Sequence, residues 1–236
     1  MKKCIIKNIE RPNAEIIEKY KQFDVSSVYE AQGKTGLLNH GLKPIIENNL
    51  ICGPAVTAIC YAESNLMVHA AIEVCKPGDI LVIKTIGESN AGMIGDLIVR
   101  ALIKKGVQGV IIDAGIRDVQ ELKKLKFPVW CKAIHSEGTT KDRAGWVNVP
   151  TVCRDVHITP GDLIIADDDG VVSVEKNNLE DTLKLTKERI KKEEKVKEKI
   201  QSGQISMDFY DLRNVLEKHN VVYFENEEDY LNRGRN

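Results

Sequence analysis

The sequence predicts an α/β protein with a helical C-terminal extension, and three observations lead to this prediction. Short apolar runs rich in β-branched residues alternate with helix-like segments between about residues 50 and 175. The run over 109–113 ends in a glycine turn, as expected of a buried strand. After the last strand candidate, charged residues dominate the chain. We therefore expect a core domain over residues 1–176 and a helical arm over residues 177–236 that packs on a neighbouring subunit.

The N-terminal part of the core, over residues 13–40, is predicted to be helical and then loop-like. The segment Ser26–Ala31 indicates a helix start, and Gly33, Gly36 and Gly41 then interrupt the helical pattern. The rest of the core alternates strand candidates with three helices. The predicted strands are 54–61, 79–86, 107–113, 128–134, 151–153, 163–167 and 171–174, and the predicted helices lie near 63–75, 92–105 and 117–124.

Three aspartate-containing segments of the core are predicted to be turns. In Lys76–Asp79 and in Thr159–Asp162, a Pro-Gly turn leads into a strand, and this alone explains both segments. The run Asp167–Gly170 lies between two strand candidates and contains Asp-Gly, which is a strong hairpin signal. We therefore interpret these aspartates as turn residues and not as metal ligands.

The arm begins with a long, charge-rich helix predicted over 179–201. Its apolar residues form only a thin stripe, and such a helix is usually solvated or packs on a partner subunit. After a break at Ser202-Gly203, the sequence predicts a shorter helix over 207–218 and a strand over 221–224. The stripe consists of Leu179, Leu183, Ile190 and Ile200.

Composition and charge limit the functions that are open to this chain. Its 236 residues, of which 42% are hydrophobic, suffice to bury a sizeable core. The net charge is −1 and the isoelectric point about 6.5, so neither a nucleic-acid partner nor a membrane surface has electrostatic support. No continuous apolar segment is longer than about ten residues, and the N-terminus lacks a signal-peptide core. Together these features predict a cytoplasmic protein.

Cysteine and histidine residues are scattered, which argues against a soft-ligand metal site. Because the six cysteines include no Cys-x-x-Cys pair, we expect reduced, mostly buried thiols and neither a zinc site nor a disulfide framework. Any metal should therefore be a hard cation held by oxygen ligands. The cysteines are residues 4, 52, 60, 75, 131 and 153, and the histidines are residues 40, 69, 135, 157 and 219.

The most informative residues are Asp96 and the pair Arg117-Asp118. Asp96 follows Gly95 and precedes apolar residues at helical spacing, so it should lie at or next to a helix N-cap. Arg117 and Asp118 follow a buried strand candidate. If this strand is parallel to its predecessor over 79–86, both groups meet at one edge of the sheet, where open α/β sheets usually bind ligands. Two acids and a fixed cation there indicate metal-assisted chemistry on an anion.

Each of these residues also has a purely structural interpretation. Asp96 can be a helix cap alone, and Asp118 can be a first-turn acid favoured by the helix dipole. Arg117 is different, because a cation in the first turn of a helix opposes the dipole. A nearby anion, either a metal-bound carboxylate or a substrate, explains an arginine at this position better than local propensity does.

Together these motifs resemble the RraA-like family over roughly residues 20–224. This family contains the class II 4-hydroxy-4-methyl-2-oxoglutarate/4-carboxy-4-hydroxy-2-oxoadipate aldolases and the regulators of ribonuclease activity. The resemblance implies an RraA-like β/β/α swivelling-type sandwich that assembles as a homotrimer or homohexamer with active sites at subunit interfaces. The motifs are Gly92-x-x-Gly95-Asp96-Leu97, the Asp96-x20-Arg117-Asp118 spacing within the run from Gly109, and the segment from Pro160 to Val171.

The resemblance implies a divalent-metal-dependent pyruvate aldolase, a carbon–carbon lyase that commonly also decarboxylates oxaloacetate. Both reactions pass through the enolate of pyruvate, whose oxyanion must be stabilised. Mg²⁺ or Mn²⁺ would be the cofactor, with no organic cofactor and no lysine Schiff base. The regulators mostly end soon after the Asp-rich hairpin, whereas this chain continues through 188–213 in the manner of the aldolases.

The family pattern also implies a role for each site residue. Asp118 would anchor the metal ion, and Arg117 would hydrogen-bond the enolate oxygen. Asp96 would transfer protons through an ordered water, unless a metal-activated water does so in its place. Backbone amides of one helix N-terminus would hold the substrate carboxylate. These amides belong to Gly95, Asp96, Leu97 and Ile98.

A further metal-site residue would come from the arm of a neighbouring subunit. In the aldolases, a glutamate of the neighbour's extension completes the outer shell of the metal. Glu193 matches this glutamate best, and Glu194, one residue further, is the alternative.

Two other functions stay open alongside the aldolase. One is a non-catalytic regulator that binds an RNA-degrading enzyme, and the other is a related lyase or hydro-lyase on an unassigned acid. Specificity for one 4-hydroxy-2-oxo acid depends on the pocket around the distal substrate carboxylate, and family resemblance does not define that pocket.

Overall fold

The computed structural model describes residues 2–38 and 40–233, which form two compact units, Met1–Lys187 and Glu188–Asn236. The sequence places the division at 176/177, just before helix α6 (Leu179–Gln201). The first unit extends into α6 because the first two turns of this helix are partly buried. Tyr20 contributes to this packing, since its hydroxyl donates a hydrogen bond of 2.8 Å to the Leu179 carbonyl. The buried residues of α6 are Leu179, Thr182, Leu183 and Thr186.

The first unit is built on one large sheet with strand order β1-β8-β3-β4-β6-β7-β2. Its centre is parallel, since β4 pairs with both β3 and β6, and β6 pairs with β7 in the same sense. The short strands β1 and β2 lie at its two ends. The strands on this path are β1 (Cys4–Ile5), β2 (Lys43–Pro44), β3 (Ile51–Tyr61), β4 (Ile80–Ile86), β6 (Gly109–Ile116), β7 (Val129–Ile134) and β8 (Trp146–Val147).

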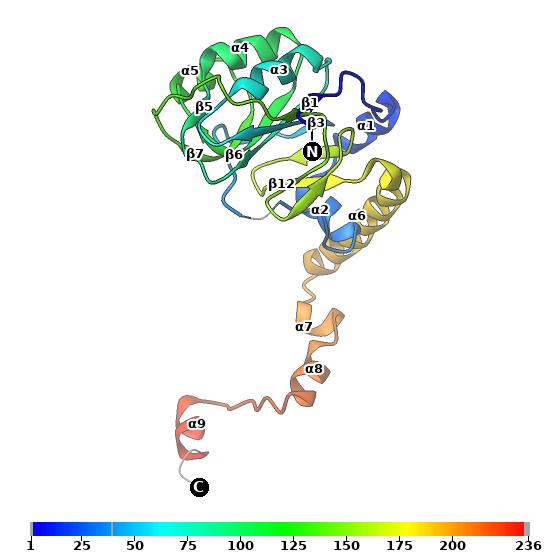
Figure 1. Cartoon of the computed structure of the whole chain (residues 1–236). Helices are drawn as coiled ribbons and strands as arrows, with labels where there is room; N and C mark the ends of the chain where they lie inside the picture. Colours follow the sequence, from blue (N-terminus) through cyan, green and yellow to red (C-terminus); the bar gives the residue numbers. More distant parts are fainter. Residues whose placement is uncertain (1, 39, 234–236) are drawn as a thin grey trace. The chain divides into compact units, whose positions relative to one another are not determined.

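Strand β3 is long enough to pair with β4 and β8 in the large sheet and also with a strand of a second β layer. Its first residues pair antiparallel with β11 (Leu163–Ala166), which forms a hairpin with β12 (Val171–Val174). From Ala55 onward, β3 pairs with β4. Helices α3 (Leu66–Val74), α4 (Asp96–Lys104) and α5 (Val119–Lys124) cover one face of the large sheet, and the hairpin lies on the other (Figure 1). The predicted α/β fold is therefore confirmed.

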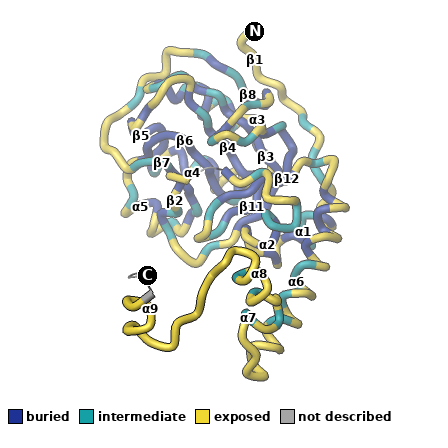
Figure 2. Tube along the Cα trace, turned by 90° about the horizontal axis from the view of Figure 1, so that it is seen from below, coloured by how far each residue is buried: buried dark blue, intermediate teal, exposed yellow. Residues whose placement is uncertain are grey.

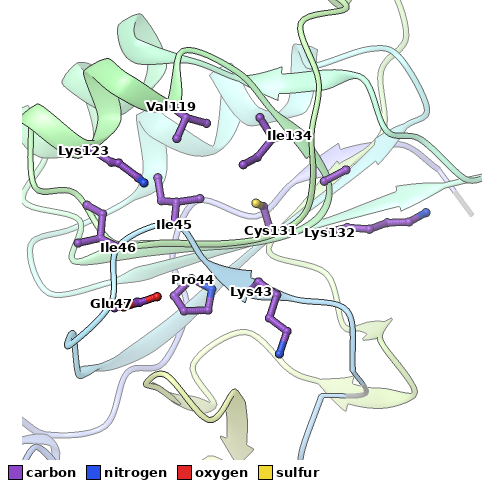
Figure 3. A pocket seen from close by; sticks show the side chains of 11 residues that line it. Lys43, Pro44, Ile45, Ile46, Glu47, Val119, Lys123, Cys131, Lys132 and Ile134 are labelled. Atoms are coloured by element: carbon purple, nitrogen blue, oxygen red, sulfur yellow. The ribbon is translucent and has the colours of Figure 1, made fainter.

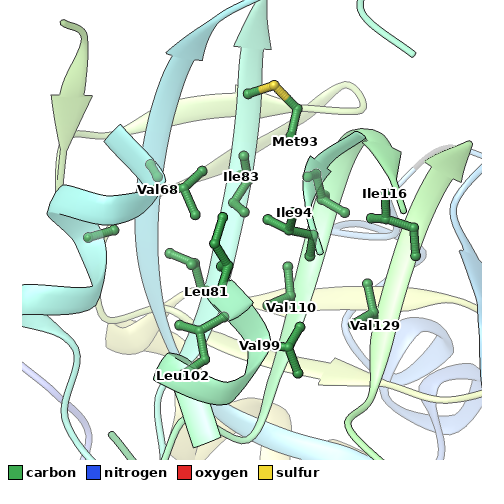
Figure 4. Close-up of a cluster of buried hydrophobic side chains, with 14 of the residues drawn as sticks. Val68, Leu81, Ile83, Met93, Ile94, Val99, Leu102, Val110, Ile116 and Val129 are labelled. Carbon is green, nitrogen blue, oxygen red and sulfur yellow. The ribbon is translucent and has the colours of Figure 1, made fainter. Parts of the chain in front are cut away.

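Two apolar cores fill the spaces between these layers. Residues of β4 and β6 alternate between them, because successive side chains of a strand point to opposite faces. Val110 and Ile112 face the helices, where Val99 and Leu102 of α4 pack (Figure 4). Ile111 faces the hairpin side, in a core with Ile80, Val82, Trp130, Ile164 and Val171. Central strands are buried, whereas α7 (Ser206–Phe209), α8 (Leu212–Lys218) and α9 (Glu227–Arg233) are largely exposed (Figure 2).

The N-terminal helices are capped by side chains. The side chain of Asn13 accepts a hydrogen bond from the Ile16 amide at the start of α1 (Ala14–Tyr20). Asp24 accepts one from the Ser27 amide at the start of α2 (Val25–Ala31), one residue before the predicted start at Ser26.

The predicted turns are confirmed, and their aspartates bond to backbone amides. Asp79 and Asp162 each accept a hydrogen bond of 2.7 Å from the amide three residues earlier. Asp167 accepts one from the Val25 amide at 2.8 Å, and Asp168 accepts one from the Asn48 amide at 2.8 Å. Burial raises the pKa of both Asp162 and Asp167. The Asp-rich hairpin therefore holds neighbouring loops in place.

Several predicted elements of the core and arm begin or end elsewhere, and three of the differences bear on the site or the arm. The helix predicted over 92–105 is split, because Gly92–Ile94 forms strand β5 beside β6 before α4 begins. The helix predicted from Arg117 begins only at Val119. In the arm, the helix predicted over 207–218 breaks at Asp211, whose φ is 54°.

The predicted strand over 221–224 is wrong. Within the described part of the chain, these residues pair with no strand and are exposed, and residues 188–233 contain no other strand that could supply hydrogen-bond partners. The arm ends instead in α9, which the sequence did not predict. The remaining strands are β9 (Thr151–Cys153) and β10 (Val156–Ile158), which form a separate hairpin.

The cysteines match the sequence prediction. All six are free, and only Cys4 is exposed. Burial raises the pKa of the Cys52, Cys60 and Cys75 thiols to about 12, so they stay neutral. In residues 2–38 and 40–233, no helix combines the length and apolar character that a bilayer crossing requires.

Candidate active site

The first part of the site is the turn from β5 into α4. Gly95 is the N-cap of α4, and Asp96 is its first residue, as the sequence predicts. The first intrahelical bond is donated by the Val99 amide to the Gly95 carbonyl. The amides of Leu97 and Ile98 therefore have no acceptor within the helix and point out of its N-terminus. Leu97 is 77% exposed, which leaves this helix end accessible.

The second part is the pair Arg117-Asp118, which follows β6. Asp118 is the N-cap of α5 but makes no capping bond with its side chain. Its backbone is left-handed, with φ 59° and ψ 31°, which is uncommon for a residue other than glycine. Arg117 lies before the cap and not in the first helical turn that the sequence predicts for it. Opposition to the dipole of α5 therefore does not explain this arginine. The Arg117 amide donates a hydrogen bond of 2.9 Å to the Ile94 carbonyl, which joins the two parts of the site.

The structure brings the predicted residues together. The Asp96 amide donates a hydrogen bond of 3.2 Å to Oδ2 of Asp118. Nε of Arg117 lies 3.7 Å from the same oxygen. A Cβ on Gly95 would lie only 2.2 Å from this oxygen, so glycine is what lets the carboxylate approach the helix end. Carboxylate, guanidinium and helix N-terminus thus converge, as the parallel strand order requires.

Asp96 has a cationic neighbour on its own helix. Nε of Arg100 lies 3.3 Å from Oδ2 of Asp96, one turn further along α4. Asp96 and the Arg117-Asp118 pair line one open cleft of about 650 Å³. This volume is typical of small-molecule sites. The other lining residues are Val119, Gln120, Glu121, Ile134, His135 and Ser136.

The strand end after β7 supplies lining residues that the sequence did not predict. The His135 backbone amide donates a hydrogen bond of 2.9 Å to the Ile116 carbonyl, and the Gly92 amide donates one of 2.8 Å to the Glu137 carbonyl. These bonds hold the 135–137 segment against the start of the site. This contribution depends on β7 lying beside β6, an arrangement that the sequence did not predict.

Asn65 is a second residue that sequence reasoning missed. It precedes α3 but makes no side-chain capping bond. Its side-chain nitrogen Nδ2 donates a hydrogen bond of 3.0 Å to the Met93 carbonyl instead. Its side-chain oxygen is buried and unpaired within the described residues. Asn65 thereby fixes β5 just before Gly95.

Asp113 lies in β6 on the face opposite to the site helices. Nζ of Lys84 lies 2.6 Å from one of its oxygens, and Nε of Arg154 lies 2.7 Å from the other. This buried carboxylate is thus held between two cations, in a cavity separate from the Arg117-Asp118 cleft.

Glu193 and Glu194, the predicted ligands from a neighbouring subunit, belong to the second compact unit. In α6, Glu193 pairs with Arg189 one turn earlier at 2.7 Å. Glu194 is exposed. Their role at a neighbour's metal site stays a prediction.

The donor set fits a hard divalent cation. The Asp118 side chain is 38% exposed, and only one of its oxygens faces Arg117 and the Asp96 amide. No cluster of three or more histidine, cysteine or acidic side chains suited to a metal is present in the described ranges. Mg²⁺ commonly keeps several waters and uses one or two carboxylates together with substrate oxygens. Asp118 is the residue that could hold such an ion.

The fold and this cleft define an α/β protein with an open cleft, lined by arginine and carboxylates, at the carboxyl ends of parallel strands. A family model described as Aldolase/RraA, RraA-like, matches residues 15–173. The chain belongs to the RraA-like family.

Three relatives illustrate the range of names in this family. A Halalkalibacterium halodurans protein named "Putative 4-hydroxy-4-methyl-2-oxoglutarate aldolase" is 31% identical over 175 residues, covering 74% of this chain and 83% of that protein. An uncharacterized Methanocaldococcus jannaschii protein is 36% identical over 200 residues, covering 83% and 91%. Streptomyces coelicolor RraAS2, described as an unusual member of the RNase ES inhibitor RraA protein family, has a TM-score of 0.72 at 26% identity, covering 80% and 99%. Names of an enzyme and of an inhibitor both occur, so the family alone does not fix the activity.

Proposed function

We propose that this protein is a divalent-metal-dependent pyruvate aldolase that cleaves 4-hydroxy-2-oxo acids of the 4-hydroxy-4-methyl-2-oxoglutarate type and also decarboxylates oxaloacetate. The observation that carries the proposal is the convergence of the Asp118 carboxylate, the Arg117 guanidinium and the N-terminus of α4 in one open cleft. The relative named as an aldolase supports the same reaction class.

The residues of this cleft can bind and orient a 2-oxo acid. Its carboxylate matches the amides of Leu97 and Ile98 at the end of α4, because these groups lack intrahelical acceptors and lie at the positive end of the helix dipole. Bound there, the 2-oxo group faces Arg117. A Mg²⁺ or Mn²⁺ ion held by Asp118 would supply a Lewis acid for the 2-oxo acid group.

Cleavage breaks the bond between C3 and C4 of the substrate. The 4-hydroxyl loses its proton and becomes the carbonyl of the second product, while the bonding electrons pass to C3 and the 2-oxo oxygen as an enolate. Arg117 places a permanent cation beside that oxygen, where negative charge develops. Asp96 accepts the hydroxyl proton through a water and returns it to C3, which yields pyruvate.

Removal of the metal tests this proposal directly. With Mg²⁺ or Mn²⁺, we expect pyruvate release from 4-hydroxy-4-methyl-2-oxoglutarate and from oxaloacetate, measured by coupling to lactate dehydrogenase. Chelator should abolish the protein-dependent rate, and added metal should restore it. Parallel reactions without protein correct for the metal-catalysed decay of oxaloacetate. Absence of metal-dependent pyruvate from both substrates would overturn the proposal.

A Gly95→Ala substitution tests the approach of Asp118 to the helix end. The added Cβ would lie 2.2 Å from Oδ2 of Asp118, so the carboxylate must move. We expect kcat/KM to fall by about 100-fold, the scale of a misplaced catalytic group. Gly95 has a φ of −144°, which alanine adopts readily, so the melting temperature should change little. Full activity of Gly95→Ala would contradict the proposed site.

Regulation of a ribonuclease is a second candidate function, because the RraAS2 structure is named for an inhibitor family. It predicts no turnover of any oxo acid and a stable protein partner. A lyase on an unassigned acid is distinguished by a third outcome. It would release no pyruvate from either substrate, yet it would catalyse metal-dependent exchange of the pyruvate methyl protons with deuterated water.

A further inference from the structure

A second cavity opens beside the candidate site, between α5 and the paired strands β2 and β7 (Figure 3). Its volume is about 620 Å³. We call this cavity the edge groove. Its apolar lining comes from Ile45, Val119, Cys131 and Ile134. Burial raises the pKa of the Cys131 thiol to about 11, so this side chain stays neutral and adds to the apolar surface.

The edge groove continues the cleft of the candidate site. Val119 and Ile134 line both cavities. Val119 directly follows Asp118, and Ile134 is the last residue of β7, directly before His135 of the cleft. A ligand held at Arg117 and Asp118 can therefore extend past these two side chains into the groove.

The charges of the edge groove favour an anion. Its lining contains three lysines, Lys43, Lys123 and Lys132, and a single acid, Glu47. Among the described residues, none of the three ammonium groups forms an ion pair or a side-chain hydrogen bond. In contrast, the neighbouring Lys124 pairs with Glu121 at 2.6 Å. Unpaired cations above an apolar floor match a ligand that combines carbon chain with a carboxylate.

Lys123 is the lysine best placed for that carboxylate. It follows Val119 by four residues in α5, so both lie on one face of the helix, about 6 Å apart along its axis. In Figure 3 its side chain leaves α5 toward Ile45, whereas Lys43 and Lys132 point away from α5. An extended lysine can thus reach the far end of a short acid that is anchored at Asp118.

We propose that the edge groove receives the distal half of the substrate and that Lys123 binds its distal carboxylate. This inference rests on the proposed function and assigns the recognition of the C5 carboxylate that substrates of the 4-hydroxy-4-methyl-2-oxoglutarate type carry. The carbon chain between the two carboxylates lies against Val119 and Ile134. Lys123 is then a specificity-determining residue, and it takes no part in breaking the bond between C3 and C4.

Two unreactive probes separate the distal carboxylate from the rest of the ligand. 2-Oxoglutarate and 2-oxopentanoate have the same five-carbon skeleton, and neither has a 4-hydroxyl group to cleave. Their dissociation constants would be measured by calorimetry on the Mg²⁺-loaded protein. We expect 2-oxoglutarate to bind more tightly, and Lys123→Met to reduce this preference by about 10- to 100-fold, as for the loss of a charged hydrogen bond. Lys123→Arg should keep most of the preference.

Lys124→Met is the matched control, because it removes the same charge from the adjacent position but faces Glu121. It should leave the preference for 2-oxoglutarate as in the unmodified protein. An unchanged preference in Lys123→Met, or equal losses in both variants, would overturn the inference while leaving the proposed function intact. Binding of neither probe to the metal-loaded protein would overturn both. Both lysines are exposed, so thermal melting should be unchanged in each variant.

Discussion

Asp118→Asn is expected to lower kcat/KM for metal-dependent pyruvate release by more than about 100-fold at subsaturating Mg²⁺. The reason is that Asp118 is the carboxylate proposed to hold the ion, and an amide oxygen carries no formal charge to attract it. The loss should diminish as the Mg²⁺ concentration is raised, which marks a defect in metal binding. The measurement is a titration of initial rate against Mg²⁺ for both proteins.

Asparagine is the informative replacement because of the backbone at this position. Asp118 has a φ of 59°, a left-handed conformation that asparagine adopts more readily than most residues. Asp118→Ala would add backbone strain and confuse the loss of charge with a shift of α5. The melting temperature of Asp118→Asn should therefore stay close to that of the unmodified protein. Equal Mg²⁺ dependence of the two proteins would remove Asp118 from the metal site.

Chain order was sufficient to predict that Asp96 and Arg117-Asp118 meet. Each group follows a strand, and parallel strands joined by helical crossovers place their carboxyl ends on one edge. The individual side-chain contacts that bring these groups together could not be predicted. The approach of Asp118 to Gly95 depends on the left-handed backbone of Asp118, and the role of Asn65 depends on a bond to Met93, 28 residues later. Such contacts follow from tertiary packing and leave no local pattern.

The errors in the arm have a different physical cause. Val221–Phe224 has strand propensity, but a strand forms only where another strand supplies hydrogen-bond partners, and the described arm has none. The 92–94 segment shows the opposite case. Its glycine-containing sequence has weak strand propensity, yet β6 lies beside it and it pairs. Propensity therefore predicted the buried strands of the core well and the partner-dependent segments poorly.

The Arg11-Asp79 pair is the clearest contact that the sequence did not reveal. A Pro-Gly turn alone accounts for an aspartate at position 79, so the sequence indicates no partner for Asp79. No motif in the N-terminal segment marks Arg11 as that partner. In the structure the two are 68 positions apart in the chain, and Nε and Nη2 of Arg11 each donate to one Asp79 oxygen at 2.8 Å. This hydrogen bonding to Asp79 also raises the pKa of Arg11. The pair joins the N-terminal segment to the start of the central strand β4.

Arg11→Met is accordingly expected to lower the free energy of unfolding by about 3–5 kcal/mol, the cost of leaving a buried charge without its partner. The Asp79 side chain is fully buried, and among its hydrogen-bond donors in the described residues, only the Lys76 amide, at 2.7 Å, would remain without Arg11. Urea unfolding followed by circular dichroism measures the difference. Lys19→Met is the control, because it removes an ion pair of 2.5 Å with Glu15, even closer than the 2.8 Å pair of Arg11 and Asp79, on an exposed helix surface. Lys19→Met should change the free energy of unfolding far less than Arg11→Met does, since solvent screens both partners of its pair. Equal losses of unfolding free energy in Arg11→Met and Lys19→Met would show that burial of Asp79 does not determine how much its ion pair stabilises the fold.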